Sequence, residues 1–123
     1  MTANDAGINE AARVLAAGGL VALPTETVYG LACDATDAHA VARLYTAKGR
    51  PSFNPLIAHV PDLEAARRVG RLSQAAEQLA AQFWPGPLTL VVPAIESATC
   101  DLARAGLLSV AIRVPAHPVA RAV

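Results

Sequence analysis

Short apolar, strand-like segments alternate along this chain with segments whose apolar residues recur at helical spacing. Glycine and proline clusters, such as Gly18-Gly19 and Pro85-Gly86-Pro87, separate these segments. Alternation of this kind predicts a domain in which helices cover a sheet. The expected helices are 8–17, 37–49, 63–69, 73–84, 97–106 and 116–123, and the expected strands are 20–24, 27–35, 56–60, 88–93 and 107–115.

The first two expected strands are too close together for a helical crossover, so they should form an antiparallel pair. The later strands are separated by helices, which is typical of parallel neighbours. We therefore expect an α+β (mixed α/β) fold in a single three-layer domain of residues 1–123.

The chain is unusually apolar, with 54% hydrophobic and 16% charged residues against ordinary values of about 45–50% and about 25%. A domain of this size does not normally hide so much apolar surface. We expect the excess to be covered by a ligand, a partner or a segment absent from this chain, or to lie in strands buried on both faces.

The formal net charge is zero, which argues against general attraction to nucleic acid or to anionic membranes. The start, "MTANDAG", is polar, and no later run approaches the ~18 apolar residues of a membrane span. We expect a cytoplasmic protein without a membrane partner.

Two cysteines, Cys33 and Cys100, lie far apart in the sequence. No Cys/His spacing suits zinc, so we expect no metal site and interpret both as reduced core cysteines. The alternative is a reactive thiol near a site. Phe83 and Trp84, at the end of an expected helix, are likewise interpreted as core residues.

Phosphate-binding sequences of the usual kinds, G-x-x-x-x-G-K-[ST] and G-x-G-x-x-G, are absent. "KGRP" offers another device, because Lys48 and Arg50 could direct two cations at one polyphosphate. Lys48 is the only lysine beside nine arginines. The alternative is a solvated helix end that favours cations.

Two further polar residues interrupt apolar strands, His59 in "LIAHV" and Arg113 in "VAIRVP". A core histidine bonded to a backbone carbonyl is the more common explanation for His59. A buried guanidinium needs an anionic partner. For Arg113 that partner is either Glu26 or Asp34, or the carboxylate of a small ligand.

Four segments together, "PTETVYGL", "KGRPSFNPLIAHV", "FWPGPLTLVV" and "VAIRVPAHPVA", resemble the YrdC-like L-threonylcarbamoyladenylate synthase family. The resemblance runs from about Ile8 to Val123, with the motifs in the family's order. It implies a twisted mixed parallel and antiparallel sheet flanked by helices. It also implies a nucleotidyltransferase that condenses L-threonine, bicarbonate or CO₂ and ATP, with Mg²⁺, into threonylcarbamoyl-AMP and pyrophosphate.

Matching motifs suggest residue roles. Lys48 and Arg50 resemble the family's K-x-R pair on the ATP phosphates, and Thr25, Thr27, His59 and Arg113 resemble its threonine pocket. On this reading "PTETVYG" is polar because it lines the substrate cavity. The product would pass to the tRNA threonylcarbamoyl transferase machinery, for the t6A modification of tRNA position 37.

The family's later S-x-N motif, which also contacts the nucleotide, is absent from these 123 residues. We expect a C-terminally truncated domain that folds partly or self-associates and lacks synthase activity. Two rivals are a carbamoyltransferase-type YrdC-like domain of hydrogenase maturation and a module that binds double-stranded RNA, or tRNA, weakly. "PTETVYG" and "FWPGPLT" favour the synthase, and the zero net charge argues against strong RNA binding.

Overall fold

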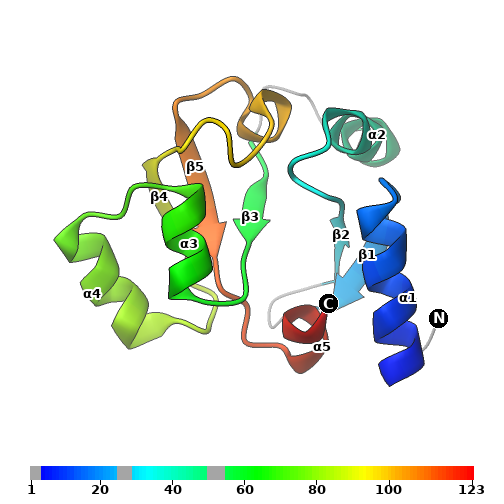
Figure 1. Ribbon diagram of the computed structural model, residues 1–123, viewed down its shortest axis with the longest axis horizontal. Coiled ribbons are helices and arrows are strands. Elements are labelled where there is room, and N and C mark those ends of the chain that lie inside the picture. Colours follow the sequence, from blue (N-terminus) through cyan, green and yellow to red (C-terminus); the bar gives the residue numbers. More distant parts are fainter. Residues whose placement is uncertain (1–3, 25–28, 50–54) are drawn as a thin grey trace.

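A computed structural model of the chain describes residues 4–24, 29–49 and 55–123. The helices and strands alternate as the sequence predicts, and the mixed α+β fold is confirmed (Figure 1). The helices are α1 (Asp5–Ala16), α2 (Ala38–Lys48), α3 (Leu63–Val69), α4 (Gln74–Phe83), the 3₁₀ helix η1 (Asp101–Arg104) and α5 (Pro118–Ala122). The strands are β1 (Val21–Pro24), β2 (Tyr29–Ala32), β3 (Ile57–His59), β4 (Leu90–Pro93) and β5 (Ser109–Arg113).

The described strands form two sheets. β1 and β2 pair antiparallel, as their closeness in sequence predicts, with Val21 opposite Ala32 and Pro24 opposite Tyr29. The second sheet has the order β3-β5-β4, in which β5 is parallel to β3 and antiparallel to β4. No ladder joins the two sheets within the described residues.

Helix boundaries follow local signals in the sequence. The side chains of Asp37 and Ser73 accept hydrogen bonds from backbone N–H groups in the first turns of α2 and α4, as N-caps do. Gly49 ends α2 in the left-handed region, at φ 63°. That conformation strains a residue with a Cβ atom, which explains why a glycine follows Lys48.

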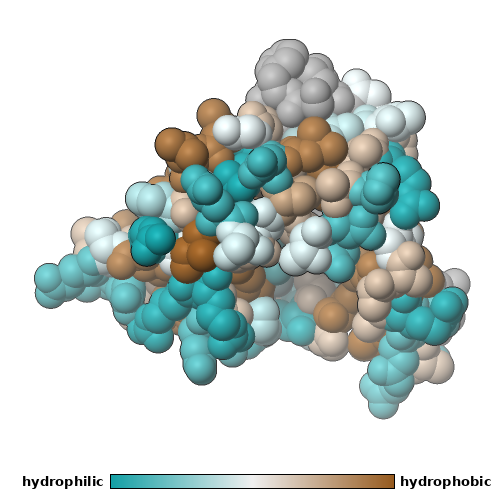
Figure 2. All heavy atoms as spheres, turned by 45° about the horizontal axis from the view of Figure 1, so that its top comes forward, coloured by the Kyte–Doolittle hydropathy of each residue, from teal (hydrophilic) through white to brown (hydrophobic). Residues whose placement is uncertain are grey.

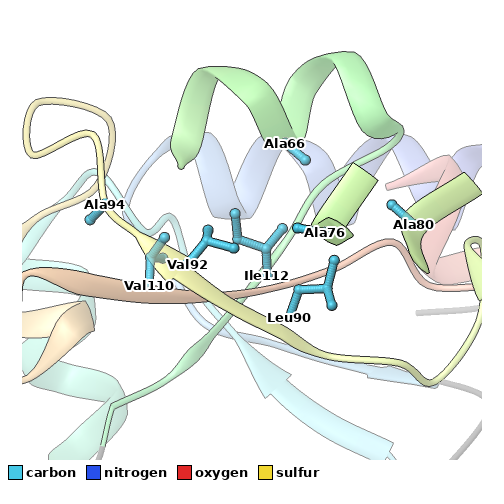
Figure 3. Close-up of a cluster of buried hydrophobic side chains, with 8 residues drawn as sticks. All are labelled: Ala66, Ala76, Ala80, Leu90, Val92, Ala94, Val110 and Ile112. Atoms are coloured by element: carbon cyan, nitrogen blue, oxygen red, sulfur yellow. The ribbon is translucent and has the colours of Figure 1, made fainter. Parts of the chain in front are cut away.

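The main core lies between α3 and α4 and one face of the β3-β5-β4 sheet (Figure 3). The helices contribute only alanines to it, which lets their backbones approach closely the branched side chains of the strands. Ile112 is completely buried at the centre. The cluster consists of Ala66, Ala76, Ala80, Leu90, Val92, Ala94, Val110 and Ile112.

Phe83 corrects one sequence expectation, because its side chain is 49% exposed. The buried stripe of α4 runs through Ala76 and Ala80, and the next inward position, four residues further on, is taken by Trp84. Trp84 packs against the main core and its Nε1 donates to the carbonyl of Leu88 at 2.8 Å. Phe83 is therefore displaced to the surface, and only Trp84 behaves as predicted.

A second, smaller core joins α2 to η1. Val41, Tyr45 and Ala103 are buried there, and both cysteines pack against them. Cys33 and Cys100 are free thiols, so the expectation of reduced cysteines is confirmed. Both are only partly buried, at the edge of this core.

Large apolar side chains also lie on the surface, as the composition suggests. Val91 and Leu108 are 68% and 74% exposed. On the face shown in Figure 2, hydrophobic side chains lie among hydrophilic ones. No helix in the described ranges is long and apolar enough to cross a membrane.

Candidate functional site

A cavity of about 590 Å³ lies between the β1–β2 hairpin and the strands β3 and β5. Its walls also include α2, the loop after β2 and the segment around η1. This volume falls in the range of about 300–1,000 Å³ that is usual for small-ligand sites. Three of the predicted site residues, Lys48, His59 and Arg113, line this one cavity.

His59 and Arg113 are neighbours across the sheet. They are paired in the parallel β3–β5 ladder, and each is the last residue of its strand. Paired residues of neighbouring strands project from the same face of a sheet. The carboxyl ends of parallel strands are also where open α/β sheets bind ligands. The sequence placed both residues in one pocket, and the ladder explains how they come together.

His59 is exposed, which corrects the view that it is a core histidine. β3 is only three residues long and lies at the edge of its sheet, so its end is not covered. The Nδ1 of His59 lies 3.2 Å from the carbonyl oxygen of Ile57, so the expected backbone contact is present, although at the surface.

Arg113 is half-buried and held by a residue that the sequence did not single out. Its Nε and Nη2 donate to Oγ1 of Thr89 at 3.0 and 2.8 Å. Within the described ranges no carboxylate forms an ion pair with Arg113. Asp34 is therefore not its partner; its Oδ1 accepts instead from the N–H and hydroxyl groups of Thr36.

Lys48 is the last residue of α2, and its side chain is exposed at the cavity. It forms no ion pair with any described carboxylate. The C-terminal end of a helix favours a cation through the helix dipole, so the backbone stabilises the ammonium group here. An ammonium without a protein counterion at a cavity wall is suited to an anionic ligand.

Cys33 also lines the cavity. Burial is the main cause that raises the pKa of its thiol to about 11, and the neighbouring Cys100, Asp34 and Asp37 add to the shift. The thiol is therefore protonated at neutral pH. A thiolate is the reactive form of cysteine, so these surroundings do not favour the reactive-thiol alternative.

Arg104, which sequence reasoning missed, is buried at the wall of the same cavity. Its guanidinium donates to the hydroxyl of Thr99, the carbonyl of Leu107 and the carboxylate of Asp101. With these acceptors the buried charge is satisfied, and the segment from Thr99 to Leu107 is tied together. Asp101 and Arg104, three residues apart, were the only signal in the sequence.

Three predicted site residues, Thr25, Thr27 and Arg50, lie outside the described residues. Glu26, one of the two protein partners considered for Arg113, also lies outside them. Among the residues that are described, no group of three His, Cys, Asp or Glu side chains could hold a metal ion.

Comparison with known proteins gives a consistent result. The Sua5/YciO/YrdC family model, which carries the description "Telomere recombination", matches residues 13–123. The threonylcarbamoyl-AMP synthase of Bacillus subtilis is 46% identical over 123 residues, which is 99% of this chain and 36% of that protein. The threonylcarbamoyl-AMP synthase of Pyrococcus abyssi is 48% identical over 92% of this chain and 33% of its own length.

A solved structure agrees with these relatives. The crystal structure of P. abyssi Sua5 complexed with L-threonine superposes with a TM-score of 0.92 at 45% sequence identity, over 97% of this chain and 35% of that one. The chain thus spans about a third of the length of these similar proteins.

Proposed function

The chain belongs to the Sua5/YciO/YrdC family, and on that premise we propose that it serves L-threonylcarbamoyladenylate synthesis. In this reaction L-threonine, bicarbonate or CO₂ and ATP give threonylcarbamoyl-AMP and pyrophosphate. The product then passes to the transferase machinery that modifies tRNA position 37.

The convergence of Lys48, His59 and Arg113 on one cavity carries the proposal. A site for this reaction must hold an amino-acid carboxylate and a polyphosphate in one enclosure. Arg113 and Lys48 supply two cations to the cavity, and neither is neutralised by a described carboxylate. The two cations lie on different elements, the end of β5 and the end of α2, so they can bind separate groups.

Arg113 would bind the carboxylate of L-threonine, since a guanidinium matches a carboxylate through two N–H groups. His59, beside it on β3, would bind the hydroxyl or amino end, together with Thr25 and Thr27. Lys48 would bind the phosphates of ATP with Arg50. ATP would enter as its Mg²⁺ complex, because Mg²⁺ is usually held largely by substrate phosphates and water.

The chemistry requires more positioning than proton transfer. The threonine nitrogen attacks CO₂ and loses a proton to give a carbamate, and a carbamate oxygen then attacks the α-phosphorus. The bond from that phosphorus to the bridging oxygen breaks, and pyrophosphate leaves with the electron pair. Fixed cations that hold the reactants together and neutralise the charge developing on phosphate would supply most of the rate.

Pyrophosphate release is the direct test of the proposal. We expect release by the 123-residue chain to require L-threonine, bicarbonate and ATP together, and to fall in the Lys48→Ala variant. Calorimetric binding of L-threonine and of ATP tests the two halves of the site even if turnover is slow. A chain that binds neither substrate would contradict the proposed function.

A further inference from the structure

The hydrogen bonds between Arg113 and Thr89 occupy one particular edge of the guanidinium. Nε and Nη2 lie on the same edge of the planar group, and both donate to the single atom Oγ1 of Thr89. A hydroxyl oxygen has two lone pairs and can accept both bonds. One of the two edges through which arginine binds a carboxylate with two N–H groups is thus already taken.

The other edge, formed by Nη1 and Nη2, remains available. Among the described residues nothing accepts a hydrogen bond from Nη1, and no described carboxylate forms an ion pair with the group. An arginine at a cavity with this edge available can bind an anion end-on. It cannot bind the anion along the Nε edge without displacing Thr89.

Thr89 itself is held by a turn that is tied to the same strand. It directly precedes β4, whose first residue, Leu90, pairs with Ile112 next to Arg113. The N–H of Gly86 donates to the carbonyl of Val114 at 2.8 Å, and Trp84 bonds to the carbonyl of Leu88. The hydroxyl is therefore placed by the fold on both sides, and it can restrain a long side chain that would otherwise sample several rotamers.

We propose that Thr89 is a positioning residue for Arg113. Its hydroxyl occupies the Nε–Nη2 edge and directs the Nη1–Nη2 edge toward the carboxylate of the amino-acid substrate, which binds end-on. The identity of that carboxylate rests on the proposed function, whereas the restraint on the guanidinium does not. Sequence reasoning treated the segment that contains Thr89 only as a loop and a strand.

The test compares Thr89→Val, which keeps the shape but removes the hydroxyl, with Thr89→Ser, which keeps the hydroxyl. Each chain is titrated by calorimetry with L-threonine and with L-threoninamide, which lacks the carboxylate charge. We expect Thr89→Val to bind L-threonine about tenfold more weakly with little change for the amide, and Thr89→Ser to stay near the parent. Thr46→Val is the matched control, because the Thr46 hydroxyl bonds within α2 to the carbonyl of Ala42.

A merely structural role for Thr89 would weaken both ligands equally, or neither. The proposal is overturned if Thr89→Val retains the parent's ratio of L-threonine to L-threoninamide affinity. Thermal unfolding of each variant shows whether a loss of binding reflects a loss of fold.

A second measurement separates this proposal from the proposed function. In ¹⁵N-labelled chain, the Arg113 Nε–H signal should exchange slowly with water in the parent and in Thr89→Ser, and about tenfold faster or more in Thr89→Val. If the parent bound no L-threonine, the proposed function would fail, and this exchange rate would still decide whether Thr89 restrains Arg113. Equal exchange in parent and Thr89→Val would overturn the positioning role whatever the ligand.

Discussion

The side chains of His59 and Arg113 project from the same face of the sheet, because the two residues are register partners in the parallel β3–β5 ladder. Backbone hydrogen bonds, not side-chain contacts, set their separation. Each can therefore be substituted without moving the other, which makes the pair suitable for binding experiments on single variants.

Arg113→Ala should abolish measurable L-threonine binding and leave ATP affinity near normal. Losing charge-assisted hydrogen bonds costs about 1.5–3 kcal/mol, or roughly ten- to a hundredfold in affinity. Arg113→Lys, which keeps the charge but not the planar donor pair, should lie between the variant and the parent. Calorimetry with each substrate is the measurement. If Arg113→Ala unfolds and Arg113→Lys binds normally, Arg113 has a structural role instead.

Lys48→Ala should weaken ATP by roughly ten- to a hundredfold and change L-threonine binding much less. The reason is that Lys48 is a cavity cation with no described counterion at the end of α2. Arg68→Ala is the control for loss of one positive charge, because Arg68 is exposed on α3 and forms only a long ion pair of 3.8 Å with Glu64. Equal ATP affinity in both variants would count against a phosphate role for Lys48.

Thiol titration should show that Cys33 ionises late. Burial raises its pKa from 9.0 to about 11, so the rate of alkylation by iodoacetamide, measured on Cys100→Ser chain, should keep rising up to about pH 11. The unfolded chain releases this proton first, so the free energy of unfolding should fall as the pH rises from about 9 to about 11. Cys33→Ser should remove that part of the pH dependence. A rate that levels off near pH 9 would contradict the buried environment.

Gly70→Ala should destabilise the chain by about 1–3 kcal/mol through overpacking. A Cβ atom at Gly70 would lie 2.6 Å from Cγ2 of Val92 and 3.0 Å from Cδ1 of Ile112, both in the main core. Gly30→Ala is the matched control, since a Cβ atom there meets nothing within 4 Å. Urea unfolding of both variants measures the difference. Similar midpoints would mean that the core can adjust to the extra methyl group.

Local chemistry explains why so many elements could be predicted from the sequence. Asp37 and Ser73 are good N-caps and Gly49 is a good C-terminal residue whatever the rest of the chain does. Each signal lies within a few residues of the helix end that it determines. The antiparallel β1–β2 pair was predictable for the same reason, because its two strands adjoin in sequence.

The contacts that build the site are not local, and the sequence could not supply them. Thr89 and Arg113 meet because β4 and β5 pair with one register, and a shift of one residue would turn either side chain to the other face. Phe83 and Trp84 have equal apolar character, so only the packed helix decides which of them is buried. The buried Arg104 was missed because its acceptors, such as the Leu107 carbonyl, are backbone groups without a sequence signature.

The cavity lies between two sheets that share no ladder in the described part of the chain. Its width is therefore set by helix packing, such as that of α2 on η1 and of α5 on β1. A molecule that touched Lys48 on one side and Arg113 on the other would act as a mechanical brace between the two halves. Its concentration would then govern how stiff the protein is, since a ligand bound only by the folded state adds stability in proportion to the logarithm of its saturation term. Substrate supply would thus set the protein's resistance to unfolding as well as its rate.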